Sequence, residues 1–175
     1  AVYDGADCVM LSAETAAGEY PERAVIMMDR IARTTEEDDN YQEMMENARP
    51  ESLNTPSDAI TTAAHYVAQD VEAKLIVNYT MSGATSLRTA RQRPEVPILS
   101  ITRSEQVARR LMISYGVFAV HDEAREEDFT GPARHAAKIA VEKGFLQTGD
   151  RFIMTAGMPL GVKGTTNILR IAKVE

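Results

Sequence analysis

Apolar positions along the chain follow two alternating patterns. Short continuous apolar runs are typical of buried strands, whereas apolar residues that recur every three or four positions are typical of helices that face a core. The runs predict strands at 7–12, 74–78, 97–101, 116–120, 151–156 and 167–174, and the helical spacing predicts helices that begin near Pro21, Thr55, Leu87, Ser104 and Ala133. From residue 55 onward this alternation predicts a three-layer α/β/α domain with a mostly parallel, five-stranded sheet.

The last two predicted strands, 151–156 and 167–174, are joined only by a short glycine-rich turn. A crossover between parallel strands needs a dozen or more residues, so we expect the last strand to be antiparallel to its neighbour.

The pattern divides the chain into three parts. Residues 1–36 form a strand, a loop and a helix, and this unit cannot bury both faces of its strand by itself. Residues 37–54 are polar and have neither period, which predicts a linker or helical connection. Residues 55–175 form a self-sufficient domain, in which Thr55 can cap a helix and Pro56 can occupy its first position. Because the first residue is not Met and the opening resembles the end of a helix, we infer a piece of a longer chain or a trimmed one.

Composition and charge exclude several classes of protein. The 175 residues are 44% hydrophobic, which supports a packed core, and the net charge of −7 argues against nucleic acid as a partner. No apolar run approaches the roughly 20 residues that span a bilayer, and the first residues do not resemble a signal peptide, so we expect no membrane partner. Cys8 is the only cysteine, which excludes an internal disulfide and favours a reducing cytoplasm.

The hydroxyl loop, residues 78–86, connects the predicted strand at 74–78 to a helical run, 87–93. It contains Thr80, Ser82, Thr85 and Ser86 with a single glycine, Gly83. A loop between a strand and a helix points backbone N–H groups and hydroxyls at one spot, where the helix dipole adds positive charge. This pattern predicts an anion site, most often for phosphate. Ser and Thr also cap helices without binding any ligand, so the residues alone leave catalysis, sensing and capping open.

A second glycine-rich segment, 157–166, superficially resembles a Walker A loop. It lacks the Gly-Lys-[Ser/Thr] triplet and leads into a strand, so we reject a nucleotide-hydrolysing P-loop. The segment predicts a hairpin turn. The alternative is a flap that closes over an anion held by the hydroxyl loop, with Lys163 adding positive charge.

Other candidate residues give weaker signals. His65, His121 and His135 lie on different predicted elements without ligand spacing, and with one cysteine we expect no metal site. Ser12 and Glu14 follow the first predicted strand, where barrel enzymes keep active-site residues, although a glutamate in such a loop is usually only solvated. We interpret six arginines as helix-surface charge rather than a nucleic-acid site: Arg88, Arg91, Arg93, Arg103, Arg109 and Arg110.

Several motifs together resemble the pyruvate kinase family. Residues 4–16 and 18–21 resemble the last barrel strand, loop and helix of that family, with Ala13 where the family usually has glycine. The family's C-terminal domain is then matched in order by Thr80-Met81-Ser82-Gly83, Arg93-Pro94, Gly144-Phe145, Gly149-Asp150 and Gly164-Thr165-Thr166-Asn167. The resemblance covers essentially the whole chain, which implies the last βα unit of a (β/α)8 barrel followed by a regulatory domain.

The resemblance implies a function for the full-length form. Pyruvate kinases transfer a phosphoryl group from phosphoenolpyruvate to ADP in glycolysis, need Mg2+ and usually K+, and are typically homotetramers. Their C-terminal domain carries an allosteric effector site and part of the subunit interface. The catalytic lysine and the metal ligands lie earlier in the barrel, outside this chain, so we expect these residues alone not to catalyse. Ser12 and Glu14 would border the active site.

The resemblance also implies an effector site. Thr80, Ser82, Gly83, Ala84 and Thr85 match the phosphate loop, and Gly161, Lys163, Gly164 and Thr165 match the closing flap. Members that respond to fructose 1,6-bisphosphate use a Trp and an Arg for its second phosphate. This chain has no Trp and has Pro132 at the position of that Arg, so we expect a sugar monophosphate or AMP instead. Arg134, two residues further on, keeps the bisphosphate alternative open.

Two other interpretations remain. The chain could be a stand-alone module that senses a phosphorylated metabolite, or chiefly an oligomerisation piece with an unused loop. The barrel-like strand and helix argue against a stand-alone module, which would have no use for them.

Overall fold

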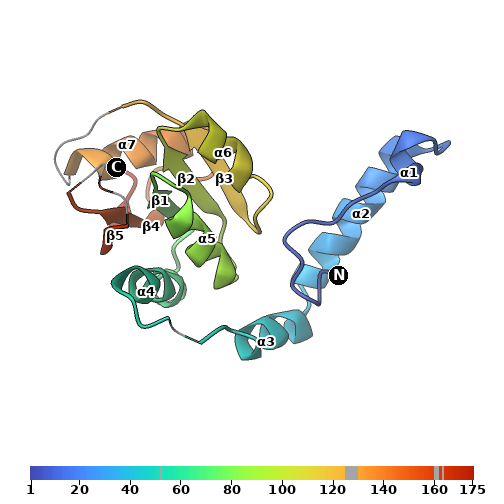
Figure 1. Ribbon diagram of the computed structural model, residues 1–175, viewed down its shortest axis with the longest axis horizontal. Coiled ribbons are helices and arrows are strands. Elements are labelled where there is room, and N and C mark those ends of the chain that lie inside the picture. The colour runs from blue at the N-terminus through green and yellow to red at the C-terminus, as the bar shows by residue number, and fades with distance from the viewer. Residues whose placement is uncertain (52, 125–129, 160–161, 163) are drawn as a thin grey trace. The chain divides into compact units, whose positions relative to one another are not determined.

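The computed structural model describes residues 1–175 except 52, 125–129, 160–161 and 163 (Figure 1). The chain divides into two compact units, Ala1–Arg49 and Pro50–Glu175.

The first unit contains three helices, α1 (Ala13–Ala16), α2 (Pro21–Glu36) and α3 (Asp39–Asn47). Pro21 opens α2 as expected. The strand predicted at 7–12 is wrong, because these residues have irregular backbone and Met10 is 84% exposed. A strand needs a neighbour to pair its N–H and C=O groups, and the described part of this unit forms no other strand.

Helix α3 lies inside the segment expected to connect the two parts. The Asp38 side chain accepts a hydrogen bond from the Asn40 N–H at 2.8 Å and caps the helix. The acidic run at 36–39 suits the C-terminus of α2 poorly, but it suits the N-terminus of α3. Charge at a helix boundary therefore marked the start of the next helix as well as the end of the first.

The second unit contains a five-stranded sheet in the order β3-β2-β1-β4-β5. Its strands are β1 (Ile76–Tyr79), β2 (Ile98–Thr102), β3 (Val117–His121), β4 (Arg151–Gly157) and β5 (Thr166–Lys173). The first four run parallel, and β5 is antiparallel to β4, with Arg151 opposite Lys173. The predicted sheet, including its antiparallel last strand, is confirmed.

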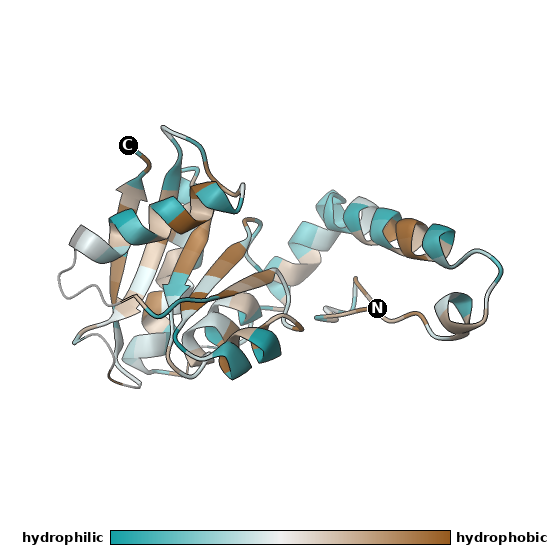
Figure 2. Ribbon diagram, turned by 90° about the horizontal axis from the view of Figure 1, so that it is seen from above, coloured by the Kyte–Doolittle hydropathy of each residue, from teal (hydrophilic) through white to brown (hydrophobic). Residues whose placement is uncertain are grey.

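Helices cover both faces of this sheet, as Figure 1 shows. Helix α7 (Thr130–Glu142) packs on the face that carries Leu75, Val77 and Phe152. Helices α4 (Pro56–Asp70), α5 (Ala84–Arg91) and α6 (Glu105–Leu111) pack on the face that carries Ile76 and Ile98. Strands buried on both faces appear as continuous apolar runs, which Figure 2 shows as brown strands between more polar helices. The three-layer prediction is confirmed.

A buried ion pair joins α4 to α5. Asp58, in the first turn of α4, is fully buried and its Oδ1 lies 2.5 Å from the Arg91 guanidinium at the end of α5. Its Oδ2 accepts a hydrogen bond from the Leu53 N–H at 2.8 Å. Thr55 caps α4 as predicted, since its side chain accepts from the Asp58 N–H. These bonds fix α5, whose first turn forms one wall of the site described next.

Candidate anion-binding site

Helix α5 begins at Ala84, three residues earlier than the sequence predicts. Its N-cap is Gly83, which has a left-handed backbone with φ of 88° and therefore favours glycine. A Cβ at this position would also lie 3.1 Å from a methyl group of Leu111. The Gly83 N–H donates to the Thr80 hydroxyl at 3.0 Å, so Thr80 shapes the turn that leads into the helix.

Several donors at the start of α5 are open. Within the described part of the chain, the N–H groups of Ala84 and Thr85 have no acceptor and the Ser82 hydroxyl has no hydrogen-bond partner. Because Gly83 is the N-cap and no side chain caps the helix, capping does not account for Ser82. Free N–H groups at the positive end of a helix dipole are the usual receptor for a phosphate.

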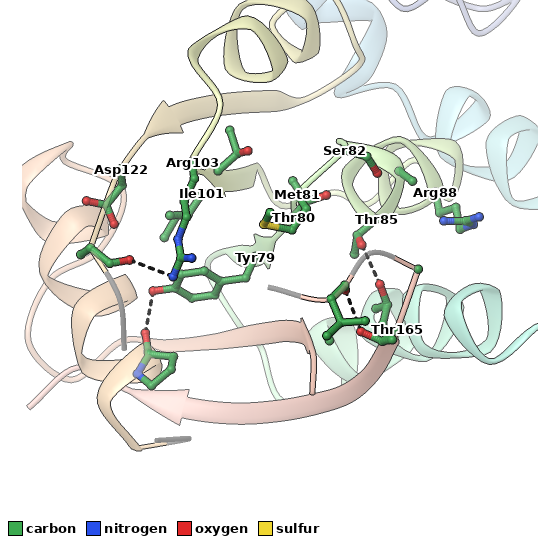
Figure 3. A pocket seen from close by; sticks show the side chains of 18 residues that line it. Tyr79, Thr80, Met81, Ser82, Thr85, Arg88, Ile101, Arg103, Asp122 and Thr165 are labelled. Atoms are coloured by element: carbon green, nitrogen blue, oxygen red, sulfur yellow. Dashed lines mark hydrogen bonds between the residues drawn. The ribbon is translucent and has the colours of Figure 1, made fainter. Parts of the chain in front are cut away.

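These donors face a pocket at the carboxyl edge of the parallel strands (Figure 3). The hydroxyl loop contributes Thr80, Met81, Ser82, Ala84 and Thr85; the segment between β4 and β5 contributes Gly157, Val162, Gly164, Thr165 and Thr166; Ile101, Arg103 and Asp122 come from the ends of β2 and β3. Ligands of open α/β sheets usually bind at this edge.

The residues predicted for the effector site come together only in part. Thr80, Ser82, Ala84 and Thr85 line the pocket, whereas Gly83 shapes the turn without lining it. Of the predicted flap, Gly164 and Thr165 line the pocket. Gly161 and Lys163 lie outside the described residues, so their part in the site stays a prediction.

Two arginines that the sequence interpretation assigned to the helix surface also line the pocket. Arg88 lies one turn after Ala84 on α5, and Arg103 follows the carboxyl end of β2. The place of Arg88 could have been predicted, because residues four apart on a helix share a face. The place of Arg103 follows from the sheet, in which β2 lies beside β1.

The other four arginines of that group have structural contacts. Arg91 pairs with Asp58, and Arg109 pairs with Glu105 at 2.6 Å. Arg93 stacks over the Tyr115 ring at 4.1 Å, and Arg110 donates to the Ser82 carbonyl at 2.8 Å. These contacts give the four arginines structural partners, although Arg93 lies after the end of α5 and not on a helix surface.

The segment between β4 and β5 is fixed to the rest of the pocket. Thr85 and Thr166 share a hydrogen bond of 2.7 Å between their hydroxyls, which joins α5 to the start of β5 (Figure 3). The Asn167 side chain binds both the N–H and the carbonyl of Met158 at 2.9 Å. A Cβ at Gly157 would lie 2.5 Å from the Thr165 hydroxyl, so the two arms of the hairpin meet at a glycine.

The two ends of the hydroxyl loop are structural. Asn78 is buried in β1, where its amide donates to Thr89 at 3.0 Å and accepts from Thr155 at 2.7 Å. The Ser86 hydroxyl accepts from Ser100 at 2.6 Å. The open groups of the loop are thus concentrated at Ser82–Thr85.

The end of the pocket away from α5 contains Tyr79, Asp122 and Pro132. The Tyr79 hydroxyl donates to the Pro132 carbonyl at 2.9 Å. Arg134 is exposed and is not among the residues that line the pocket. This arrangement supplies no arginine from α7 for a second phosphate.

Ser12 and Glu14 belong to the first unit. The Ser12 N–H donates to the Glu14 carboxylate at 3.0 Å. The pKa of Glu14 is lowered because its carboxylate accepts from its own backbone N–H and from that of Ser12. Glu14 thus accepts from backbone N–H groups at the start of α1, and its place beside an active site stays a prediction.

Two classes of feature are missing from the described residues. They contain no group of three or more His, Cys, Asp and Glu side chains placed to hold a metal ion. In the same part of the chain, no helix is long and apolar enough to cross a membrane.

Fold and pocket together define a three-layer α/β domain with a pocket, at the carboxyl edge of its parallel strands, that open backbone N–H groups of α5 face. Residues 58–172 match the family model for the pyruvate kinase alpha/beta domain, and residues 1–25 match the model for the pyruvate kinase barrel domain. The chain belongs to the pyruvate kinase family.

Similar proteins agree with this assignment. The chain is 43% identical over 174 residues to a pyruvate kinase of Methylorubrum extorquens, and this match covers 99% of the chain and 36% of that protein. It is 38% identical over 172 residues to one of Geobacillus stearothermophilus, covering 98% of the chain and 29% of that protein. A crystal structure of a pyruvate kinase from Cryptosporidium parvum superimposes with a TM-score of 0.84 at 31% identity, covering 99% of the chain and 34% of that structure. The chain therefore spans about a third of the length of these relatives.

Proposed function

We propose that this chain is the C-terminal portion of a pyruvate kinase and that the pocket at α5 is its allosteric effector site. The full-length form would transfer a phosphoryl group from phosphoenolpyruvate to ADP. The observation that carries the effector site is the set of open donors at Ser82, Ala84 and Thr85, beside the side chain of Arg88. A phosphate there would accept several charge-assisted hydrogen bonds at a helix N-terminus.

The pocket supports binding better than catalysis. Phosphoryl transfer needs metal ions and cations around the transferring group, and the described residues offer no metal-binding cluster. We assign the Mg2+ and K+ sites, like the catalytic lysine, to the part of the barrel that these residues do not include. The purified 175-residue chain should form no pyruvate from phosphoenolpyruvate and ADP in the presence of both ions. Turnover that depends on Mg2+ would contradict this assignment.

A single-phosphate effector is favoured, either a sugar monophosphate or AMP. The chain has no Trp, Pro132 lies in the pocket wall, and Arg134 does not line the pocket. Among the described residues, the pocket therefore offers a binding site for one of the two phosphates of fructose 1,6-bisphosphate and none for the other.

Calorimetric titration tests the site directly. Inorganic phosphate, ribose 5-phosphate, glucose 6-phosphate and AMP should each bind the 175-residue chain, and Ser82→Asp should abolish binding because it places a carboxylate at the phosphate position. Thr148→Asp is the matched control, since it adds the same charge in an exposed loop before β4, at the opposite edge of the sheet. Silence of all four ligands with the unaltered chain would instead favour a purely structural role in oligomerisation.

A stand-alone sensor of phosphorylated metabolites is the second candidate. The match of residues 1–25 to the barrel domain favours an enzyme, because a sensor would have no use for this segment. We further infer a homotetramer for the full-length form, with this domain at a subunit interface. Light scattering of the full-length enzyme with and without residues 50–175 tests that inference by counting subunits. An unchanged number of subunits would contradict it.

A further inference from the structure

The pocket is electrically asymmetric. The open N–H groups of Ala84 and Thr85 lie at one end together with Arg88, and Asp122 lies at the other. In Figure 3 Asp122 is across the pocket from Thr85 and Arg88, with the Tyr79 ring between them. A ligand whose phosphate binds at α5 would extend toward a carboxylate.

Asp122 is held in place from two sides. Its N–H donates to the Thr102 carbonyl at 2.9 Å, which continues the pairing of β2 with β3. Its Oδ2 lies 2.6 Å from Nε2 of His135 on α7. Within the described part of the chain the Oδ1 atom has no hydrogen-bond partner, so it is available to a ligand in the pocket.

The described basic groups beside Asp122 already have partners, because His135 bonds to Asp122 itself and Arg103 donates to the Ala124 carbonyl at 3.5 Å. Arg103 is the cationic side chain among the described lining residues at this end, and it is exposed. Pro132 carries no charge, and the Tyr79 hydroxyl already donates to the Pro132 carbonyl. A phosphate placed here would meet the Asp122 carboxylate, and like charges a few ångströms apart repel. A sugar hydroxyl, in contrast, could donate to Oδ1.

We propose that Asp122 is the specificity-determining residue of the pocket. Its carboxylate accepts a hydrogen bond from a hydroxyl of a single-phosphate ligand and repels a second phosphate. This inference rests on the proposed function, because it needs a phosphate at α5. The ligand class is a phosphate monoester that carries hydroxyl groups, which sugar monophosphates and AMP share. His135 is a positioning residue that orients the carboxylate.

The test compares four ligands on three variants by calorimetry with the 175-residue chain. The ligands are inorganic phosphate, ribose 5-phosphate, AMP and fructose 1,6-bisphosphate. Asp122→Asn keeps the shape and removes the charge, and Asp122→Ala also removes the acceptor. Glu123→Gln is the matched control, because it removes an equal charge from the neighbouring residue, whose exposed side chain does not line the pocket. Thermal unfolding of each variant checks that it is folded.

The unaltered chain should bind ribose 5-phosphate more tightly than fructose 1,6-bisphosphate. Asp122→Asn should strengthen bisphosphate binding about tenfold and leave inorganic phosphate unchanged. Asp122→Ala should weaken ribose 5-phosphate toward the affinity of inorganic phosphate, and the AMP arm shows whether the base adds affinity beyond the shared hydroxyls. Glu123→Gln should change none of these values.

Different failures overturn different claims. If phosphate and ribose 5-phosphate bind but Asp122→Asn leaves their ratio to the bisphosphate unchanged, or if Glu123→Gln shifts it equally, the role of Asp122 is refuted and the effector site stands. If inorganic phosphate does not bind the unaltered chain, the proposed site and this inference both fail.

Discussion

Helices α2 and α4 show how differently the two units use the same kind of sequence pattern. Both begin with proline at the first turn and carry apolar residues at helical spacing. On α4, Ala64 and Ala68 are 0% and 3% exposed, because they pack on Ile76 and Ile153 of the sheet. On α2, Val25, Ile26, Met27 and Ile31 remain 48–59% exposed. An amphipathic pattern thus specifies a helix locally, whereas burial depends on a partner surface.

The largest expected difference between the units is the cost of deleting an apolar side chain. Phe152 is fully buried in the core beneath α7, so Phe152→Ala should lower the free energy of unfolding by about 4 kcal/mol. Ile26→Ala on α2 removes an exposed side chain and should change it by less than about 0.5 kcal/mol. Urea unfolding followed by circular dichroism measures both values. Equal losses would show that α2 is buried in solution, for example against another copy of the chain.

The next largest effect concerns ion pairs. Arg91→Met leaves the fully buried Asp58 carboxylate without its cation and should cost about 3 kcal/mol. Arg109→Met breaks the exposed pair with Glu105 and should cost less than about 0.5 kcal/mol. The same urea measurement applies. If Arg91→Met costs no more than Arg109→Met, Asp58 is solvated in solution and the link between α4 and α5 is weak.

A smaller effect is expected from the buried polar network of the second unit. Thr155→Val keeps the side-chain shape but leaves the side-chain amide oxygen of Asn78 without its donor. It should therefore lower the free energy of unfolding by about 2 kcal/mol. Thr148→Val in an exposed loop is the control and should be close to neutral. A neutral Thr155→Val would mean that another donor, such as water, reaches Asn78.

The smallest effect is a pH response in the first unit. The pKa of Asp38 is lowered from its usual value of 3.8, chiefly because the carboxylate accepts from the Asn40 N–H and also from the Tyr3 hydroxyl. Because the pKa is lowered in the folded state, this contribution to helix α3 is present above the unfolded pKa and disappears as the pH falls through the folded one. The NMR shift of the Asn40 amide proton should therefore move below about pH 4, and Asp38→Asn should remove the transition. An Asn40 amide that does not respond to acid would contradict the cap.

The sequence predicted the second unit well because each of its elements is specified locally and then buried. Pro56 and Thr55 mark the start of α4, and the strands of the sheet are apolar on both faces. The strand predicted at 7–12 failed because an apolar run becomes a strand only beside another strand. The prediction for 37–54 was a linker or helical connection without helix bounds, and α3 lies in this segment with Asp38 as its cap.

The sequence predicted part of the pocket lining, from the hydroxyl loop and from the segment between β4 and β5. Ser82, Ala84 and Thr85 lie on one loop and were identified together. Arg103 and Asp122 come from other strands, and their place depends on sheet order, which the chain order does not reveal. The predicted start of α5 was three residues late, because Gly83 in a left-handed conformation replaces the expected Ser or Thr cap.

The hydrogen bond between Thr85 and Thr166 has a consequence for the order in which the protein is made. The two residues are 81 positions apart, and β5 is the strand of the sheet that a ribosome synthesises last. A nascent chain that ends before Thr166 contains the whole of α5 but lacks the hydrogen bond that joins α5 to β5, and β4 has an unpaired edge. The metabolite binding proposed above should therefore be complete only after β5 is added, so a ligand would not stabilise the earlier steps of folding on the ribosome.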